Sequence, residues 1–374
     1  MFVRLYRQEE IRSCGLLCAF GAVAAVLLWL PQAAATGINR GLSVCANVII
    51  PTLYPFMILA GLLTDSPVCR RPGRLAEALT RCIFHLPGCA APVILISLVG
   101  GYPAGALAIS RLCRQNRLTP EQAHRMTLFC VNGGPGFIVT TVGSGLLGST
   151  AAGLLLFAAH AVTSLIFGIL LGIRHRRDPI TAEAVIPDES ERGLSETVSD
   201  TVAALLSMCG FVVLAAAVLS LTDAIGLPGA VARLCHVRAT DVSGALAAVL
   251  EVSCGCIALA GTGGGDLFRL CLCMSWGGLS VQGQLATLLK GYVSLDSVFT
   301  LFRLLHGIVS GCLALLLFRM IPIRFPSVGV WAPAGGRPAL SSSVQASAAL
   351  LGLTFFAMLC FYPKKTGNST QGVL

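Results

Sequence analysis

Long apolar runs recur along almost the whole of this 374-residue chain, and they limit its fold more than any other feature. A helix needs about 20 mostly apolar residues to cross the hydrocarbon core of a bilayer. Charged residues make up only 11% of the chain, whereas soluble domains carry about 25%. We therefore expect an integral, all-α membrane protein. The predicted spans are residues 13–33, 42–63, 127–147, 150–172, 202–222, 267–288, 296–318 and 345–362.

The same composition excludes several classes of protein. Disordered chains and nucleic-acid-binding domains need more charge, and the net charge of +9 comes from arginines that gather between the apolar runs, as in cytoplasmic loops of membrane proteins. Most of the 16 cysteines fall inside apolar runs and lack metal-ligand spacing, and no lysine stands in a nucleotide-binding loop. We expect no enzyme activity, no metal and no cofactor, and leave open only a coupling proton or cation.

Two further apolar stretches, 91–110 and 241–262, are interrupted near the middle, by Gly100-Gly101-Tyr102-Pro103 and by Ser253-Cys254-Gly255. Arginines cluster on both sides of the first stretch. Both clusters lie on the cytoplasmic side if the stretch enters the membrane and returns, as the positive-inside rule prefers. We therefore predict two re-entrant hairpins. The sequence Thr119-Pro120-Glu121-Gln122 has the pattern of a capped helix start, so a short helix is expected before the next span.

The two halves of the chain show weak matches in the same order. Each half has a long apolar run, an interrupted stretch, a Gly-Gly pair, and then a His and a Ser four residues apart. The first half enters the membrane from outside and the second from inside. The predicted fold is therefore two inverted repeats with broken helices and re-entrant hairpins, about eight spans plus two hairpins, as in secondary transporters. The predicted division is an N-terminal span (1–40), repeat 1 (41–177), an acidic cytoplasmic linker (178–200), repeat 2 (201–320) and a C-terminal span and tail (321–374).

Five motifs stand in order along these repeats. They are GGYPAGA at 100–106, FCVNGGPGFI at 129–138, EVSCG at 251–255, GGLSVQGQ at 277–284 and FRLLHG at 302–307. Together they resemble the YlbJ-type sporulation integral membrane proteins, a group in the nucleoside-recognition (Gate) domain family, which is related to concentrative nucleoside transporters. The resemblance implies movement of dipicolinic acid, a small aromatic dicarboxylate, from the mother cell across the outer forespore membrane.

The residues themselves indicate only a transporter-like membrane protein, and the small planar anion comes from the resemblance. Two alternatives stay open: a non-transporting sporulation membrane scaffold, and a nucleoside-type permease. The expected partners are the lipid bilayer and a small-molecule anion such as dipicolinate, with no nucleic acid. A homo-oligomer and contacts with other sporulation membrane proteins are also left open.

The hairpin tips and the broken helices form the predicted site, because a break frees backbone N–H and C=O groups for a substrate at mid-membrane. Glu251 is the acidic residue set deepest in an apolar run, which indicates a proton or cation site or contact with an aqueous cavity. Arg303 could bind a substrate carboxylate or neutralise Glu251 or Asp296, and His306 could relay protons. The candidate substrate-binding residues are Gly101, Tyr102, Pro103, Gly105, Asn132, Gly134, Pro135, Glu251, Ser253, Gly255, Ser280, Gln282, Arg303 and His306.

Overall fold

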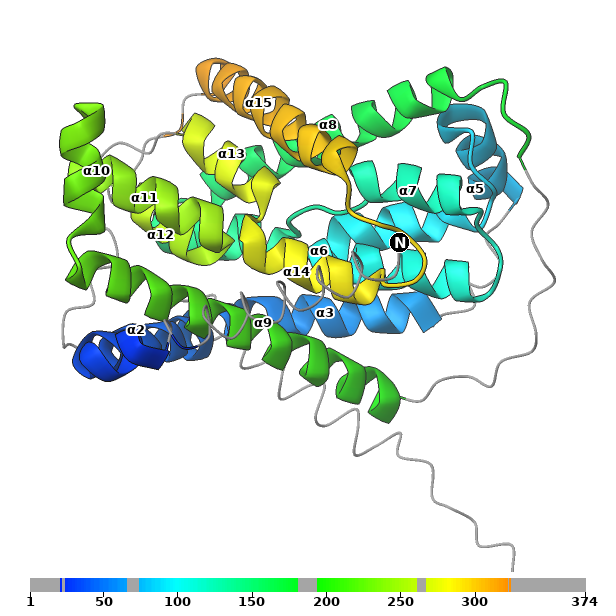
Figure 1. The fold of residues 1–374 in the computed structure, drawn as a ribbon. Helices are drawn as coiled ribbons and strands as arrows, with labels where there is room; N and C mark the ends of the chain where they lie inside the picture. Colours follow the sequence, from blue (N-terminus) through cyan, green and yellow to red (C-terminus); the bar gives the residue numbers. More distant parts are fainter. Residues whose placement is uncertain are drawn as a thin grey trace, which may run out of the picture.

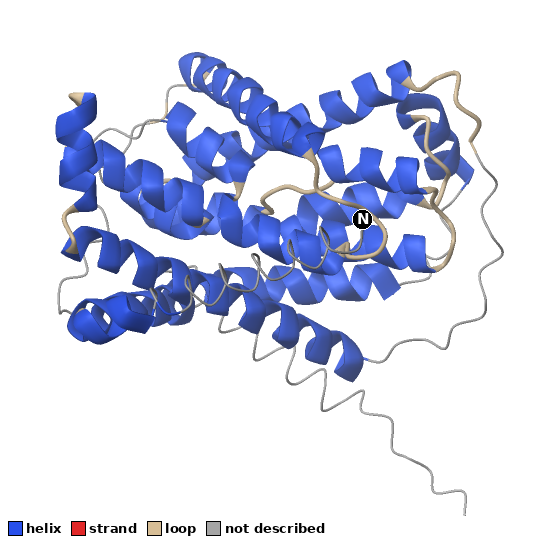
Figure 2. Cartoon of the chain, viewed as in Figure 1, coloured by secondary structure: helices blue, strands red, loops and turns tan. Residues whose placement is uncertain are grey.

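The computed structural model describes residues 21, 24–65, 74–180, 194–260, 267–321 and 323. Within these ranges all regular secondary structure is helical, which confirms the predicted all-α class (Figure 2). The predicted span at 345–362, about half of that at 13–33 and much of the linker lie outside the described residues. Five helices are long and apolar enough to cross a membrane: Pro31–Leu63, Ala90–Arg114, Thr150–Arg174, Leu194–Ala224 and Ser297–Met320.

The chain up to residue 180 contains α-helices and π-helical segments, the latter marked η. They are α2 (Pro31–Val44), η1 (Cys45–Ile49), α3 (Ile50–Asp65), α5 (Arg74–Leu79), η2 (Thr80–Phe84), α6 (Ala90–Arg114), α7 (Pro120–Phe129), η3 (Gly136–Leu146) and α8 (Thr150–Arg174). The first three join into one long helix, so the predicted gap between the runs 13–33 and 42–63 is wrong. This helix begins at Pro31, because a proline costs no hydrogen bond in a first turn.

Among the described residues from 194 onward, all helices are α-helices. They are α9 (Leu194–Ala224), α10 (Leu227–Cys235), α11 (Ala239–Leu250), α12 (Val252–Ala260), α13 (Leu267–Trp276), α14 (Gly278–Leu288) and α15 (Ser297–Met320). This part of the chain therefore has the order long helix, short helix, two paired arms, broken helix and second long helix.

Helix α6 turns back on itself at Gly101, whose φ of 78° and ψ of −168° suit glycine alone. A Cβ atom placed on Gly105 would lie 3.1 Å from the Cβ atom of Ser97. In a continuous helix, residues this far apart in sequence are separated by about 12 Å along the axis. The two arms of α6 therefore lie side by side, and the prediction that residues 91–110 fold back is confirmed. We call this segment hairpin 1.

Helices α11 and α12 form the second pair of arms, hairpin 2. They meet at Glu251, whose φ of −155° and ψ of 133° are extended. A Cβ atom placed on Gly255 would lie 2.5 Å from the Cα atom of Ala248, so the two arms touch. The helix break thus falls at Glu251 and not at Ser253-Cys254-Gly255 as predicted. Gly255 instead lets the arms approach each other, because any larger side chain would collide with α11.

The broken helices predicted after the two hairpins are present, and each is interrupted at its Gly-Gly pair. Helix α7 ends at Phe129 and η3 begins at Gly136, while α13 and α14 are separated at Gly277. The φ angle of Gly277 is +76° and that of Gly278 is +81°, in the left-handed region that glycine tolerates. The predicted capping box of α7 is confirmed: the Thr119 hydroxyl accepts from the Gln122 N–H, and the Gln122 side chain accepts from the Thr119 N–H.

The long helices α2, α3 and α9 lie along one side of the molecule, and α8 and α15 lie along the other (Figure 1). The hairpins and the broken helices occupy the space between them. Helices α2 and α9 pack closely, since a Cβ atom on Gly37 would lie 2.6 Å from the Cα atom of Ala217. Large apolar side chains are exposed on the outer helices, among them Leu154, Leu206 and Leu316, as expected for surfaces that face lipid.

Candidate functional site

A cavity of about 30 Å³ lies between the two hairpin tips, and we call it the central cavity. Both tips contribute to its wall, together with the first helix break, α14 and the paired helices α3 and α9. Its lining includes six of the predicted site residues: Gly101, Tyr102, Pro103, Gly134, Glu251 and Ser253. It also includes Gln284, a polar residue of the GGLSVQGQ motif that ranked below Ser280 and Gln282 as a candidate. Gln284 follows Ser280 by one helical turn, and this four-residue spacing was the signal that favoured it.

Each hairpin tip rests on the break of the helix that follows it. A Cβ atom on Gly134 would lie 2.8 Å from the backbone nitrogen of Gly101, so tip and break touch through their main chains. In the second half, a Cβ atom on Gly278 would lie 2.7 Å from the Cα atom of Glu251. No side chain fits at either contact. The glycines of the two motifs therefore let the tips approach the breaks and place both pairs beside the central cavity.

Glu251 is 3% exposed and is the one charged side chain in the described lining of the central cavity. Its Oε2 atom accepts a hydrogen bond from the Cys254 N–H at 2.8 Å, so the carboxylate caps the first turn of α12. Within the described chain Glu251 has no ion-pair partner. An unpaired ionised carboxylate in an apolar environment is costly.

Tyr102 and Arg303 each reach across to the helix break of the other half. The Tyr102 hydroxyl, on the tip of hairpin 1, donates to the carbonyl of Met274 in the last turn of α13. Arg303, on α15, donates from Nη2 to the carbonyl of Leu128 at 2.6 Å and from Nη1 to the carbonyl of Val131. The last carbonyls of a helix lack intrahelical partners, so these side chains satisfy groups that the breaks leave free.

Arg303 is 2% exposed and lies outside the lining of the central cavity. Its guanidinium sits at the C-terminal, negative end of α7, where a cation is favoured. Within the described residues it has no carboxylate partner, so the structure does not show the ion pair with Glu251 or Asp296 that was one of the two alternatives for Arg303. Asp296 instead caps α15 by accepting from the Phe299 N–H at 2.9 Å, and it lies 3.2 Å from His124.

His306 is fully buried in a polar cluster between α8, α13 and α15. Its Nδ1 atom lies 2.6 Å from the Ser275 hydroxyl, and its Nε2 atom lies 3.0 Å from the Ser164 hydroxyl and 3.2 Å from the carbonyl of His160. The rings of His160 and His306 are 5.2 Å apart. This cluster does not line the central cavity, so the geometry brings His306 together with Ser164 and His160 but not with Glu251.

The other predicted site residues lie around the cavity wall without lining it. Asn132 donates to the carbonyl of Phe129 at 2.6 Å, and Pro135 immediately precedes η3. Gly105 packs against the backbone of Cys130. On α14, the Ser280 hydroxyl and the Gln282 amide nitrogen are buried without a hydrogen-bond partner. Buried polar atoms without partners are rare in folded proteins.

The described residues contain no group of three His, Cys, Asp or Glu side chains that could hold a metal ion. The fold and the site together define a polytopic α-helical membrane protein in which two hairpin tips and a helix break meet at a buried cavity. The chain is similar to the sporulation integral membrane protein YlbJ of Bacillus subtilis (strain 168). The two are 26% identical over 343 residues, which cover 83% of this chain and 84% of that protein, and this supports the YlbJ-type resemblance. No protein-family profile and no solved structure match the chain.

Proposed function

We propose that the protein is a sporulation-associated membrane transporter for a small planar anion, dipicolinate by resemblance. The observation that carries the proposal is the central cavity, where both hairpin tips meet the first helix break around one buried carboxylate. Similarity to a sporulation integral membrane protein supports the role in sporulation. A pure scaffold would need neither a cavity at this depth nor glycines that hold two tips against two breaks.

Two inverted repeats account for the arrangement. Both parts of the chain follow the order long helix, short helix, hairpin, broken helix, long helix. The leading helices of the two parts run antiparallel, because Gly37 approaches Ala217 whereas Gly61 approaches Thr197. Inverted repeats with broken helices allow a site to open alternately to the two sides of a membrane, since either repeat can move relative to the other.

The backbone around the cavity favours an anion. Helices η3, α12 and α14 all begin beside the central cavity, and the N-terminal ends of helices carry partial positive charge. Glu251 opposes an anion unless its charge is removed. We therefore propose that a proton or a cation occupies Glu251 when the dicarboxylate binds, so that the substrate and its coupling ion share one site.

Substrate must enlarge the site. About 30 Å³ is the space of one or a few waters, so an aromatic dicarboxylate fits only if the hairpin tips separate. At the closest contacts between tips and breaks the main chains meet at glycines, so no side chains interlock there. The structure accordingly supports a closed state of the transporter, with the hairpins as the moving parts.

The membrane orientation follows from arginines. Arg111 and Arg125 lie at the end of the molecule where α9 begins: Arg111 pairs with Asp200, and Arg125 donates to the carbonyl of Phe84. Arg174 ends α8 near the same place, where His85 contacts the carbonyl of Asp178. Under the positive-inside rule this end is cytoplasmic. By resemblance, that membrane is the outer forespore membrane and that cytoplasm is the mother cell's.

The test is uptake of radiolabelled dipicolinate into proteoliposomes that contain the full chain. We expect saturable uptake that competing unlabelled dipicolinate abolishes and that nucleosides leave unchanged. Uptake of uridine or adenosine instead would favour the nucleoside-type permease. No uptake of either compound by protein that is folded and inserted would favour the scaffold and refute the proposal.

The coupling ion is tested with Glu251→Gln, which keeps the size and the hydrogen-bonding capacity of the side chain. We expect dipicolinate uptake by the unaltered chain to rise with an imposed inward proton gradient, and uptake by the variant to be independent of that gradient. Glu196→Gln, at the start of α9 and away from the cavity, is the matched control. Uptake that is unchanged by Glu251→Gln at every pH would contradict a role for Glu251 in coupling.

A further inference from the structure

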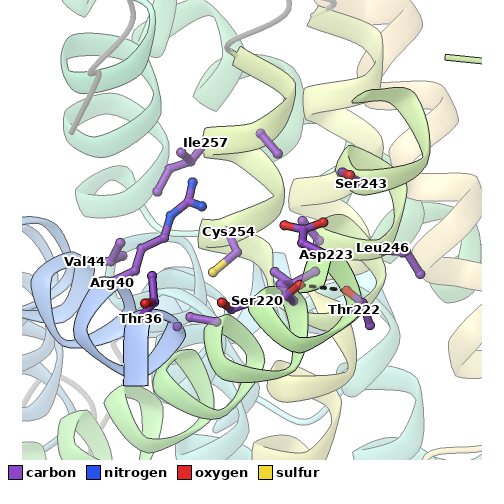
Figure 3. A pocket seen from close by; sticks show the side chains of 15 residues that line it. Thr36, Arg40, Val44, Ser220, Thr222, Asp223, Ser243, Leu246, Cys254 and Ile257 are labelled. Carbon is purple, nitrogen blue, oxygen red and sulfur yellow. Dashed lines mark hydrogen bonds between the residues drawn. The ribbon is translucent and has the colours of Figure 1, made fainter. Parts of the chain in front are cut away.

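A second and larger pocket, of about 170 Å³, lies between α2, α9 and hairpin 2 (Figure 3). We call it the vestibule. Six polar side chains from three helices line it. They are Thr36, Arg40, Ser220, Thr222, Asp223 and Ser243.

Arg40 is the cation of the vestibule. Its side chain extends from α2 toward α12, and Asp223 stands on the opposite wall (Figure 3). Within the part of the chain that the structure describes, Arg40 makes no side-chain hydrogen bond and no ion pair, and neither does the carboxylate of Asp223. A guanidinium presents donors in a fixed fork that matches a carboxylate, so an unpaired arginine in a pocket is suited to binding one.

The vestibule adjoins the central cavity along two helices. On α9, Ala216 lines the vestibule and Val212, one turn away, lines the cavity. On hairpin 2, Cys254 lines the vestibule and Glu251 lines the cavity, and the Cys254 N–H is the group that Glu251 binds. A ligand that moves along α12 therefore passes from the side of Arg40 to the side of Glu251.

The opposite end of the molecule contains a related pocket in which the charges are paired. It is about 50 Å³ in volume and is lined by α3, the start of α9 and the returning arm of hairpin 1. Met57 and Pro103 line both this pocket and the central cavity. In this smaller pocket, Nη2 of Arg111 lies 3.5 Å from Oδ2 of Asp200. The pocket that contains the ion pair is therefore the smaller one, and the vestibule, in which Arg40 and Asp223 are not paired, is the larger one.

We propose that the vestibule is an anion-binding site in which Arg40 holds a small carboxylate as it passes to or from the central cavity. The carboxylate is identified as an aromatic dicarboxylate only through the proposed function. The presence of an unpaired arginine in this open pocket does not depend on that function. When the vestibule is empty, closure of the gap would let Arg40 pair with Asp223, as Arg111 pairs with Asp200 at the other end.

Cys254 reports on this site, because it lines the vestibule and is partly exposed. Purified full-length protein is treated with an anionic or a cationic thiol reagent, 2-sulfonatoethyl or 2-(trimethylammonio)ethyl methanethiosulfonate. Labelling of each cysteine is followed by mass spectrometry, with the exposed Cys235 as the internal reference. We expect the anionic reagent to modify Cys254 preferentially. Arg40→Gln should lower this preference roughly tenfold, Arg40→Lys should retain it, and Asp223→Asn should increase it.

Protection by ligand tests the chemical class. Dipicolinate should slow the labelling of Cys254 in the unaltered and Arg40→Lys proteins but not in Arg40→Gln, and the neutral pyridine-2,6-dicarboxamide should not protect. Three results would each overturn the proposal: no labelling of Cys254, a charge preference that Arg40→Gln leaves unchanged, or equal protection by the neutral compound. If charge preference and protection are found while proteoliposomes take up no dipicolinate, the proposed transport function is refuted. The proposal that the vestibule binds anions is then still supported.

Discussion

The contact between Arg303 and the end of α7 gives the most direct test of how the fold is held. Arg303→Met keeps much of the apolar stem but removes the donors that serve the carbonyls of Leu128 and Val131. A hydrogen bond to a charged group contributes about 1.5–3 kcal/mol, and a buried carbonyl left without a donor costs about 1–3 kcal/mol. Removing the buried charge offsets part of this loss, because its desolvation is no longer needed.

The net destabilisation expected for Arg303→Met is therefore about 2–4 kcal/mol. For a protein of this size we expect the apparent melting temperature to fall by roughly 3–5 °C, measured as loss of the monodisperse gel-filtration peak after heating in detergent. Arg303→Lys keeps the charge but not the forked arrangement of donors. Its melting temperature should lie between those of the unaltered protein and of Arg303→Met.

Arg319→Met is the matched control for this substitution, because Arg319 lies in the last turn of the same helix and is exposed. Its effect should be within about 0.5 kcal/mol, or less than about 1 °C. A melting temperature of Arg303→Met equal to that of Arg319→Met would refute the view that Arg303 secures the break of the opposite half.

Three further substitutions test separate parts of the structure by the same melting assay. Gly278→Ala should destabilise the protein by at least about 1–2 kcal/mol, because φ is +81° and the Cβ atom would lie 2.7 Å from the Cα atom of Glu251. Gly210→Ala is the control: it has open space around it and should be neutral or stabilising. Tyr102→Phe should cost about 1–2 kcal/mol, since it leaves the Met274 carbonyl without its donor; an unchanged melting temperature would contradict that contact. Asp296→Ala should cost about 1 kcal/mol at neutral pH by removing the cap of α15. The Phe299 N–H holds the pKa of Asp296 below its ordinary value, so the stability difference should be present above pH about 4 and shrink as the pH falls below it; a difference that grows in acid would contradict this sign.

Features fixed by local chemistry could be predicted from the sequence. Thr119 and Gln122 form the expected capping box, since the pattern needs only a few neighbouring residues. The turn of hairpin 1 falls at the predicted glycine pair, because few residues other than glycine can adopt the backbone angles of Gly101. The apolar runs also predicted the all-α class, because backbone groups in lipid must be satisfied within the segment.

Features that depend on contacts between distant segments could not be predicted. The sequence interpretation assigned Arg303 to substrate or to a carboxylate, since helix periodicity shows which residues share a face but not what faces them. The actual partners are the backbone carbonyls of Leu128 and Val131 and the side-chain oxygen of Asn132, and no sequence pattern marks a contact between these segments. The break at Glu251 was missed for a related reason: the glycine that drew attention, Gly255, serves the packing of the arms and not the turn. Arg40 stands near the boundary predicted between two runs, and only the continuous helix places it in a pocket.

The two cross-contacts impose a condition on any opening of the central cavity. Tyr102 belongs to hairpin 1 yet binds the end of α13, while Arg303 belongs to α15 yet binds the end of α7. Hairpin 1 can therefore leave the cavity only if the Tyr102 bond breaks or if α13 moves with it. A neutral hydrogen bond contributes about 1 kcal/mol net, whereas the two bonds of a buried guanidinium contribute several times more. The weaker contact lies on the tip and the stronger one lies behind the break, so the tip can release while the broken helix α7 stays anchored. That difference in strength favours a hinge at hairpin 1 over a movement of α7.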